Sequence, residues 1–266
     1  MRGPSLSAAL IALALLVVPS FARADGSAQL SVDQVGIDQR LGNRLPLDAS
    51  LRTTGGDTVT LRSVFRERPV VLILAYSKCP TLCNLVLREM VQATHGTEAR
   101  PGRDYDLATI SIDPDETLEI AKGTEDRLMS SAGLPASSGA WRYFLAEREA
   151  IDKVASAIGF RFAFDPQTRS WAHPAAAFVL TADGRLSSVL LGLRHDPAEI
   201  DAAVREAAQG RIAEPPKFSA ATICFALEPS GKHAGAVRWG LRGLGIAVLG
   251  GLAALVLGVR GWRRTP

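Results

Sequence analysis

The segment from Val70 to Met90, VVLILAYSKCPTLCNLVLREM, constrains the fold of this chain more than any other. It begins with an apolar run rich in β-branched residues, which predicts a fully buried strand of the kind found in parallel sheets. The residues after Cys83 favour a helix, and Pro80 suits a first helical position because its missing N–H would have no partner there. The segment therefore predicts a buried strand that leads, through Cys79 and Cys83, directly into a helix.

Two cysteines, Cys79 and Cys83, flank Pro80-Thr81-Leu82 at the expected amino end of this helix. Their Cα atoms would lie about 6 Å apart on one helical face, which permits either a disulfide or a shared metal ion. The helix dipole and neighbouring Lys78 should favour the thiolate, the form that attacks disulfides and binds metals. A structural disulfide or two buried thiols are the alternatives, although a structural bridge more often ties distant segments together.

Hydrophobic segments near both ends predict export and membrane anchoring. Residues 1–24 contain Arg2, an apolar run and Ala22-Arg23-Ala24, which is typical of a cleaved secretory signal peptide. The uncharged stretch Gly243–Val259 has tryptophan and arginine on both sides and predicts a transmembrane helix, with its flanks, over 239–262. An uncleaved anchor and a buried core helix are the alternatives. We expect a single-pass protein of the cell inner membrane, with its globular domain in the periplasm and its C-terminus in the cytoplasm.

Between these segments, the sequence predicts one domain over residues 25–209, followed by a linker over 210–238. Strand and helix patterns alternate at first, which implies parallel strands joined by right-handed crossovers. Two later apolar runs are joined by an Asp-Gly turn and predict an antiparallel hairpin. This order is similar to the thioredoxin fold, so we expect an α/β domain with a central mixed sheet. The expected strands are 58–61, 70–75, 105–112, 141–145, 160–164, 176–180 and 186–193, and the helices are 84–90, 117–134, 147–158 and 197–208.

The charge balance argues against nucleic acid as a partner. The chain has 30 Lys and Arg against 27 Asp and Glu, a net charge of +3, and the basic residues are scattered. Export would place the cysteine pair in an oxidising compartment, where such a pair forms a disulfide unless it is reduced or metal-bound. The third cysteine, Cys224, lies in the predicted linker and is expected to be inert, with lipidation, an intermolecular bridge or a third thiol of the site as the alternatives.

Other polar residues have ordinary structural explanations. Asp113, Asp115 and Glu116 precede a predicted helix, where acidic residues more often cap the helix than bind a metal ion. We expect Arg66-Glu67-Arg68 to form a solvated turn and His195 to lie on the surface. None of these residues is therefore a candidate for the functional site.

Taken together, these features resemble the Sco/SenC family, thioredoxin-fold proteins that handle copper during assembly of cytochrome c oxidase. The resemblance covers roughly residues 33–209. It rests on Cys79-Pro80-Thr81-Leu82-Cys83, on Ser111-Ile112-Asp113-Pro114, and on His173 ahead of the Asp183-Gly184 turn. The combination of this cysteine motif with a later histidine before a hairpin is its specific part, because two cysteines at this spacing alone would not identify the family.

The resemblance implies that Cys79, Cys83 and His173 bind one copper ion, as Cu(I) or Cu(II). Two thiolates suit Cu(I), and the imidazole is a ligand that Cu(II) accepts, so this donor set is compatible with either state. Zinc would fit the same ligands, but nothing in the sequence supplies the general base that a hydrolytic zinc site needs. One departure is Ala172, which stands where family members often carry an acidic residue before the histidine.

The function implied by the resemblance is that of a metallochaperone. It would pass copper to the copper-bearing subunit of a respiratory oxidase, or exchange it with another copper donor or acceptor. The alternative is a thiol-disulfide oxidoreductase, an enzyme in which Cys79 and Cys83 are the catalytic redox pair that keeps target cysteines reduced. The sequence favours the metallochaperone, because His173 has no required role in the exchange reaction. The two activities are compatible, since a target must have reduced thiols before it accepts copper.

Overall fold

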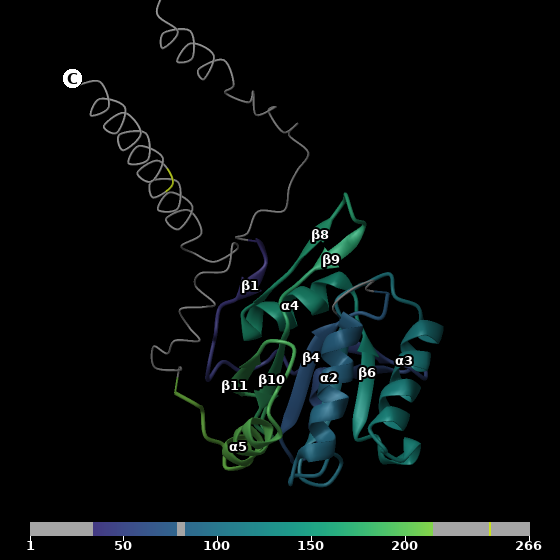
Figure 1. Cartoon of the computed structure of the whole chain (residues 1–266). Coiled ribbons are helices and arrows are strands. Elements are labelled where there is room, and N and C mark those ends of the chain that lie inside the picture. The colour runs from purple at the N-terminus through teal and green to yellow at the C-terminus, as the bar shows by residue number, and fades with distance from the viewer. Residues whose placement is uncertain (1–33, 79–82, 215–244, 246–266) are drawn as a thin grey trace, which may run out of the picture. The chain divides into compact units, whose positions relative to one another are not determined.

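A seven-stranded mixed sheet with the strand order β11-β10-β4-β5-β6-β2-β3 forms the centre of the fold (Figure 1). The computed structural model describes residues 34–78, 83–214 and 245. The sheet strands are β2 (Ser50–Thr53), β3 (Thr58–Thr60), β4 (Val70–Ala75), β5 (Asp106–Ser111), β6 (Trp141–Leu145), β10 (Ala176–Leu180) and β11 (Leu186–Leu191). Strands β4, β5 and β6 are parallel and the other pairs are antiparallel, which confirms the predicted mixed α/β sheet.

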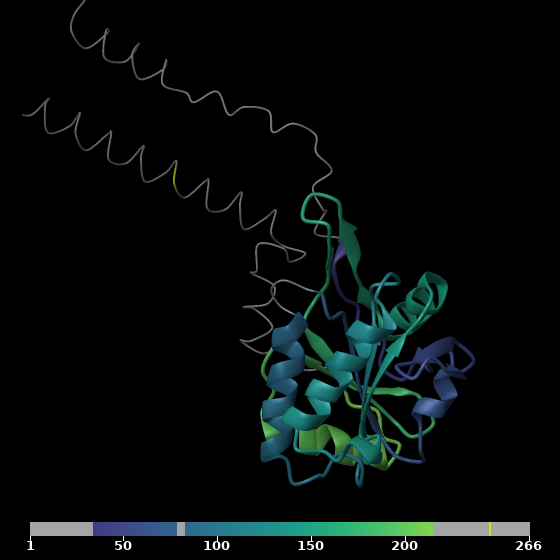
Figure 2. The same ribbon diagram turned by 90° about the vertical axis from the view of Figure 1, so that its right-hand side faces the viewer.

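Helices cover both faces of this sheet (Figure 2). Helices α2 (Cys83–Gly96) and α3 (Leu118–Ser131) lie on one face, as right-handed crossovers between three parallel strands require. Helix α4 (Arg148–Ile158) lies on the other face, and α5 (Pro197–Ala208) packs against β10, β11 and α2. The short 3-10 helices η2 (Leu61–Val64) and η3 (Ala136–Ser138) precede β4 and β6. The predicted helices are therefore confirmed, and α2 continues to Gly96.

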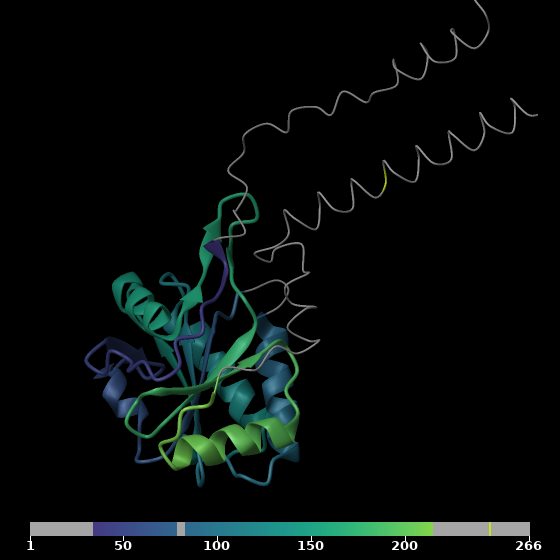
Figure 3. The same cartoon turned by 90° about the vertical axis from the view of Figure 1, so that its left-hand side faces the viewer.

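Two small strand pairs lie beside the main sheet. Strand β1 (Gly36–Ile37) pairs with β7 (Phe160–Arg161), and β8 (Ala163–Asp165) pairs with β9 (Ser170–Ala172). The β8–β9 hairpin extends away from the central sheet (Figure 3). The prediction of one strand over 160–164 is therefore wrong, because its two halves pair with different partners.

The core is built on strands that are buried along their whole length. All residues of β4, β5 and β10 are buried, and for β4 and β10 the uninterrupted apolar runs in the sequence predict this burial. Full burial of one large apolar side chain contributes roughly 1.5–3 kcal/mol. Met90 on α2 is completely buried and belongs to this core.

Strand register determines which chain segments meet at one end of the sheet. The parallel pairing of β4 and β5 aligns Ala75 with Ser111, so both strands end at the same edge. Strand β10 runs antiparallel to β4, with Phe178 opposite Leu72, so the residues before β10 reach this edge as well. His173 and the segment that leads from β4 into α2 therefore lie at the same end of the sheet.

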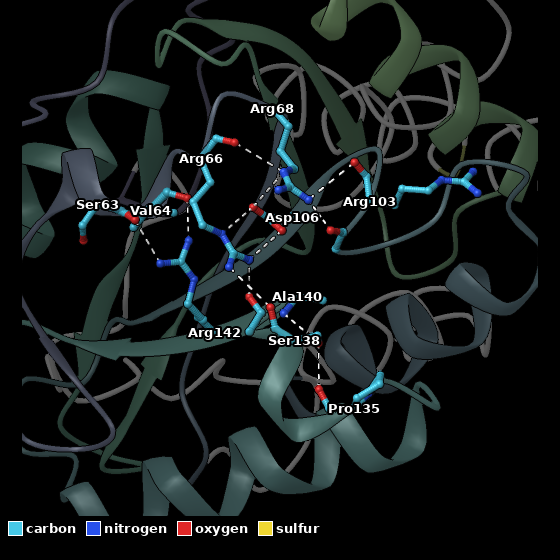
Figure 4. A network of polar contacts seen from close by, with 12 residues as sticks. Ser63, Val64, Arg66, Arg68, Arg103, Asp106, Pro135, Ser138, Ala140 and Arg142 are labelled. Atoms are coloured by element: carbon cyan, nitrogen blue, oxygen red, sulfur yellow. Dashed lines mark hydrogen bonds and ion pairs between the residues drawn. The ribbon is translucent and has the colours of Figure 1, made fainter.

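The turn at Arg66-Glu67-Arg68 is not simply solvated, which corrects the sequence-based expectation. Arg66 forms a two-point ion pair with Asp106, whose side chain is fully buried, with Nη2–Oδ1 and Nε–Oδ2 distances of 2.9 and 3.1 Å (Figure 4). The Arg68 Nε lies 3.7 Å from the Asp106 Oδ2. Between the two arginines, Glu67 adopts a left-handed conformation with a φ of 61°, which costs a non-glycine residue about 1–2 kcal/mol. The ion pairs to Asp106 hold this turn against the sheet.

His195 is buried, so the expectation of a surface position is wrong. Only 7% of the residue is exposed, in the connection between β11 and α5. Neither ring nitrogen has a hydrogen-bond partner in the described part of the chain. Burial lowers the pKa of His195, because the charged imidazolium loses its hydration. The residue therefore packs as a neutral ring.

No helix within residues 34–78 and 83–214 is both long and apolar enough to cross a membrane. The predicted signal peptide over 1–24 lies outside the described residues. The same holds for the predicted transmembrane helix over 239–262, apart from Gly245, and for most of the linker over 210–238.

Candidate metal centre

The candidate centre lies where β4 leads into α2. The strand ends at Ala75, and Tyr76, Ser77 and Lys78 continue the chain to the cysteine motif. Helix α2 begins at Cys83, so this cysteine occupies the amino end of a helix as predicted. Cys79 and the side chain of Cys83 lie outside the described residues.

His173 lies in the loop between β9 and β10, three residues before β10 begins at Ala176. Its ring centroid is 6.0 Å from the centroid of the Tyr76 ring, in an edge-to-face arrangement. The Phe160 ring lies at the same distance of 6.0 Å on a tilted approach. The structure therefore brings His173 close to Tyr76, which precedes Cys79 by three residues in the sequence.

The environment of His173 sets its protonation state. Burial lowers the pKa of the imidazole, and the hydrogen bond to the Pro174 carbonyl opposes this shift only in part. The Nδ1 atom lies 2.9 Å from that carbonyl oxygen. Because a carbonyl only accepts, this contact assigns the proton to Nδ1 and the lone pair of the neutral ring to Nε2. A neutral imidazole with one nitrogen oriented in this way is the form that binds metal ions.

The Pro174 carbonyl is a hydrogen-bond acceptor for His173 where Ala172, the residue before the histidine, offers no acidic side chain. A metal-binding histidine usually donates its second ring N–H to a carboxylate, a backbone carbonyl or water. Ala172 supplies no carboxylate, and the neighbouring backbone oxygen takes this role instead. The sequence could not predict this contact, because it depends on the local turn of the loop.

A hollow of about 760 Å³ opens at this end of the sheet. Tyr76, Lys78, Asp113 and Asp115 lie along one part of it, and the β8–β9 hairpin supplies the rest, including Trp171. The Tyr76 hydroxyl accepts a hydrogen bond from the Trp171 backbone N at 3.2 Å, which ties the hairpin to the end of β4. The hollow gives another molecule access to this end of the sheet.

The acidic residues before α3 do not act as its cap, which corrects the sequence-based expectation. Thr117 caps α3 by accepting a hydrogen bond from the Ile120 backbone N at 3.4 Å. Glu116 instead points inward and is only 3% exposed. Its Oε2 atom accepts hydrogen bonds from Ser111 at 2.5 Å, from Tyr143 at 3.0 Å and from the Ser77 backbone N at 3.3 Å. A buried carboxylate therefore contacts the chain two residues before Cys79.

Residues 34–78 and 83–214 do not complete a metal site by themselves. No three histidine, cysteine, aspartate or glutamate side chains converge within this part of the chain. The described residues contribute one candidate ligand, His173, whose ring lies 6.0 Å from that of Tyr76, three residues before Cys79 in the sequence. A neutral imidazole is a nitrogen donor that suits copper or zinc, and cysteine thiolates would add the sulfur donors that both metals accept.

Comparison with protein families adds a match over most of the folded region. A model of the SCO1/SenC family matches residues 50–209. No curated protein matches the sequence.

Solved structures share the fold. A protein of Aquifex aeolicus VF5, described as a candidate electron transfer protein, is 26% identical, with a TM-score of 0.55 and coverage of 64% of this chain and 95% of that one. A SCO1/SenC family lipoprotein from Bacillus anthracis is 15% identical, with a TM-score of 0.51 and coverage of 65% and 98%. Arabidopsis thaliana ScoI, solved with copper bound, is 16% identical, with a TM-score of 0.50 and coverage of 64% and 98%. The last two show likeness of fold alone.

Proposed function

The chain belongs to the SCO1/SenC family, and from this premise we propose that its domain binds one copper ion through Cys79, Cys83 and His173. We further propose that it delivers this copper to the copper-bearing subunit of a respiratory oxidase during assembly of cytochrome c oxidase. The copper-bound structure of Arabidopsis thaliana ScoI gives an example of a similar fold that holds the metal. Copper is the cargo in this proposal, and it reaches the site as Cu(I) or Cu(II).

The observation that supports this proposal best is the state and position of His173. The ring is neutral, its Nδ1 donates to the Pro174 carbonyl, and its centroid lies 6.0 Å from that of Tyr76. Thiol-disulfide exchange alone requires no such imidazole. A copper site that accepts both oxidation states does, because Cu(II) prefers nitrogen donors whereas thiolates favour Cu(I).

A second function, thiol-disulfide exchange, has one specific observation in its favour. Cys83 is the first residue of α2, where the helix dipole favours a thiolate. One cysteine would attack a target disulfide, and the other would resolve the mixed disulfide, so that the target is reduced while Cys79 and Cys83 become oxidised. This reaction would prepare the thiols of a copper acceptor.

Replacing His173 by alanine separates these two functions. We expect the variant to lose much more affinity for Cu(II) than for Cu(I), because Cu(I) can remain two-coordinate between two thiolates. Disulfide exchange should change only modestly, since thiolate fraction and access set its rate. The measurement compares Cu(I) affinity, Cu(II) affinity and disulfide-reductase rate with those of the wild type, and then scores oxidase assembly in cells.

His95 provides the matched control for this variant. It is exposed on the last turn of α2, and its Nε2 lies 3.0 Å from the Ser131 carbonyl, away from the cysteine motif. His95→Ala should leave all three measurements unchanged. If His173→Ala loses exchange and keeps normal affinity for both copper states, His173 is not a ligand and the oxidoreductase is the main function.

We also propose that the domain is exported and anchored in the inner membrane by the segment 239–262, with the C-terminus in the cytoplasm. The support is the signal-like sequence over 1–24 together with one late apolar stretch. A reporter that is active only in the cytoplasm, fused to Pro266, should be active in intact cells. An inactive reporter would overturn this orientation, and a fusion at residue 209 should be inactive as the control.

A further inference from the structure

The Glu116 carboxylate contacts Ser77, which precedes the cysteine motif by two residues in the sequence. Three groups contact its Oε2 atom: the Ser77 backbone N just after β4, the Ser111 hydroxyl at the end of β5 and the Tyr143 hydroxyl from the middle of β6. Glu116 Oε1 is buried and has no hydrogen-bond partner in the described part of the chain. A carboxylate that is held in this way is not explained by capping of α3, which Thr117 provides.

A chain of hydrogen-bond donors is directed toward Glu116. Arg127 donates to Thr124 at 2.8 Å, and Thr124 donates to the Ser77 hydroxyl at 2.9 Å. The Ser77 hydroxyl donates to the Tyr143 hydroxyl at 3.2 Å, which donates to Glu116 at 3.0 Å. The pKa of Tyr143 is raised well above its ordinary value, first by burial and then by the charge of Glu116, so this hydroxyl keeps its proton. The chain of donors thus ends on the Glu116 carboxylate.

Chain connectivity limits the distance from this charge to the proposed copper site. The Glu116 Oε2 is 3.3 Å from the Ser77 backbone N. Two further residues can span at most about 8 Å from that nitrogen to the Cys79 Cα. The carboxylate therefore lies within about 12 Å of that atom, and because Glu116 itself is only 3% exposed, little water surrounds the carboxylate to screen its charge.

We propose that Glu116 is a positioning residue whose buried negative charge makes the copper site favour Cu(II) over Cu(I). The inference rests on the proposed function, because it assumes copper at Cys79, Cys83 and His173. Two thiolates leave a Cu(I) complex with a net charge of −1 and a Cu(II) complex without net charge. A nearby carboxylate therefore repels the Cu(I) complex more. The hydrogen bond to Ser77 holds the charge beside the segment that leads into the motif.

The variant Glu116→Gln tests the charge without changing the shape. Its amide oxygen can take the place of Oε2, and its NH2 group can take the place of Oε1, which has no hydrogen bond to lose within the described residues. At this distance one charge changes the ratio of Cu(II) to Cu(I) affinity by roughly tenfold. We expect Glu116→Gln to lower this ratio by about tenfold, which raises the one-electron potential of bound copper by about 59 mV. Competition with chelators for each copper ion gives the ratio in the full chain.

Glu125 offers a matched control. Its Oε1 accepts a hydrogen bond from the Tyr143 backbone N at 2.9 Å, and its Oε2 accepts one from Thr54 at 2.5 Å, so it is a partly buried carboxylate without contact to Ser77. Glu125→Gln should leave the ratio unchanged. A second measurement uses the metal-free protein and follows the chemical shift of the Ser77 amide. This shift should differ from that of the wild type in Glu116→Gln and match it in Glu125→Gln.

The outcomes separate this inference from the proposed function. If the wild type binds no copper, the proposed function fails and the inference with it. If the wild type binds copper and Glu116→Gln keeps the ratio, or shifts it no more than Glu125→Gln does, only the inference is wrong. Glu116→Asp keeps the charge and serves as the second variant if Glu116→Gln does not fold. If Glu116→Asp has a ratio of Cu(II) to Cu(I) affinity near that of the wild type, the proposal is supported. If this ratio falls tenfold although the charge is retained, the proposal is overturned.

Discussion

Replacing Cys79 or Cys83 by serine should abolish stoichiometric copper binding and disulfide exchange together. A serine hydroxyl stays protonated at neutral pH and is a hard oxygen donor, so it replaces neither the soft ligand of Cu(I) nor the nucleophile. The loss of affinity should exceed the roughly 100-fold that removal of an outer-shell partner can cause. Each variant is measured by Cu(I) competition with a chelator and by its rate of disulfide reduction.

The third cysteine provides the control, because Cys224→Ser makes the same chemical change outside the candidate site. It should leave both activities at the wild-type level. The oxidised wild type should bind Cu(I) as poorly as the serine variants, since a disulfide consumes both thiolates. Tight, stoichiometric binding by a sample without titratable thiols at Cys79 and Cys83 would contradict the proposed ligand set.

The sequence predicted the elements that are stabilised by burial. Strands β4 and β10 are uninterrupted apolar runs, and the Asp183-Gly184 turn marks the hairpin between β10 and β11. Such signals are local, so they can be read without knowing what each strand pairs with. The role of His173 came instead from the family resemblance, and the antiparallel pairing of β10 with β4 accounts for its position near Tyr76.

The sequence did not predict the short strands, because they lack such local signals. Strand β2 (Ser50–Thr53) lies between β3 and β6, and β9 (Ser170–Ala172) exists through its pairing with β8. Neither segment has a period-2 pattern long enough to predict a strand, because its stability comes from partners that are distant in sequence. The division of residues 160–164 between β7 and β8 has the same origin.

Buried polar residues were the main failure of sequence reasoning at the candidate site. Glu116 follows Asp113 and Asp115 in a segment that resembles a helix start, and nothing local distinguishes its inward orientation. The distinction arises from Ser77, Ser111 and Tyr143, which reach the same point from three adjacent strands or the residues just after them. One signal was available in retrospect: Thr117 is a sufficient cap, so the adjacent glutamate was not needed for that role.

Asp106→Ala should destabilise the domain by about 3 kcal/mol, the lower end of the range for breaking one partner of a buried ion pair. Asp106 is fully buried, and its removal leaves Arg66 and Arg68 facing an apolar cavity without their counter-charge. The side chains of these arginines are 36% and 28% exposed, so they can recover part of their hydration. In a domain of this size, the loss corresponds to a fall in melting temperature of about 6–12 °C.

The exposed pair of Arg148 with Asp152 provides the control, because it has a similar distance of 2.8 Å but side chains that are 50% and 48% exposed. Asp152→Ala should cost no more than about 0.5 kcal/mol, since water screens the pair in the folded state and solvates both groups when it is broken. Thermal and urea unfolding of the two variants measure the loss of stability for the same substitution at a buried and at an exposed ion pair. If both lose equal stability, the depth of Asp106 is not what makes its ion pairs important. A large loss for Asp106→Ala alone would mean that the turn at Glu67 depends on this carboxylate, because no other acidic side chain in the described residues pairs with Arg66 or Arg68 (Figure 4).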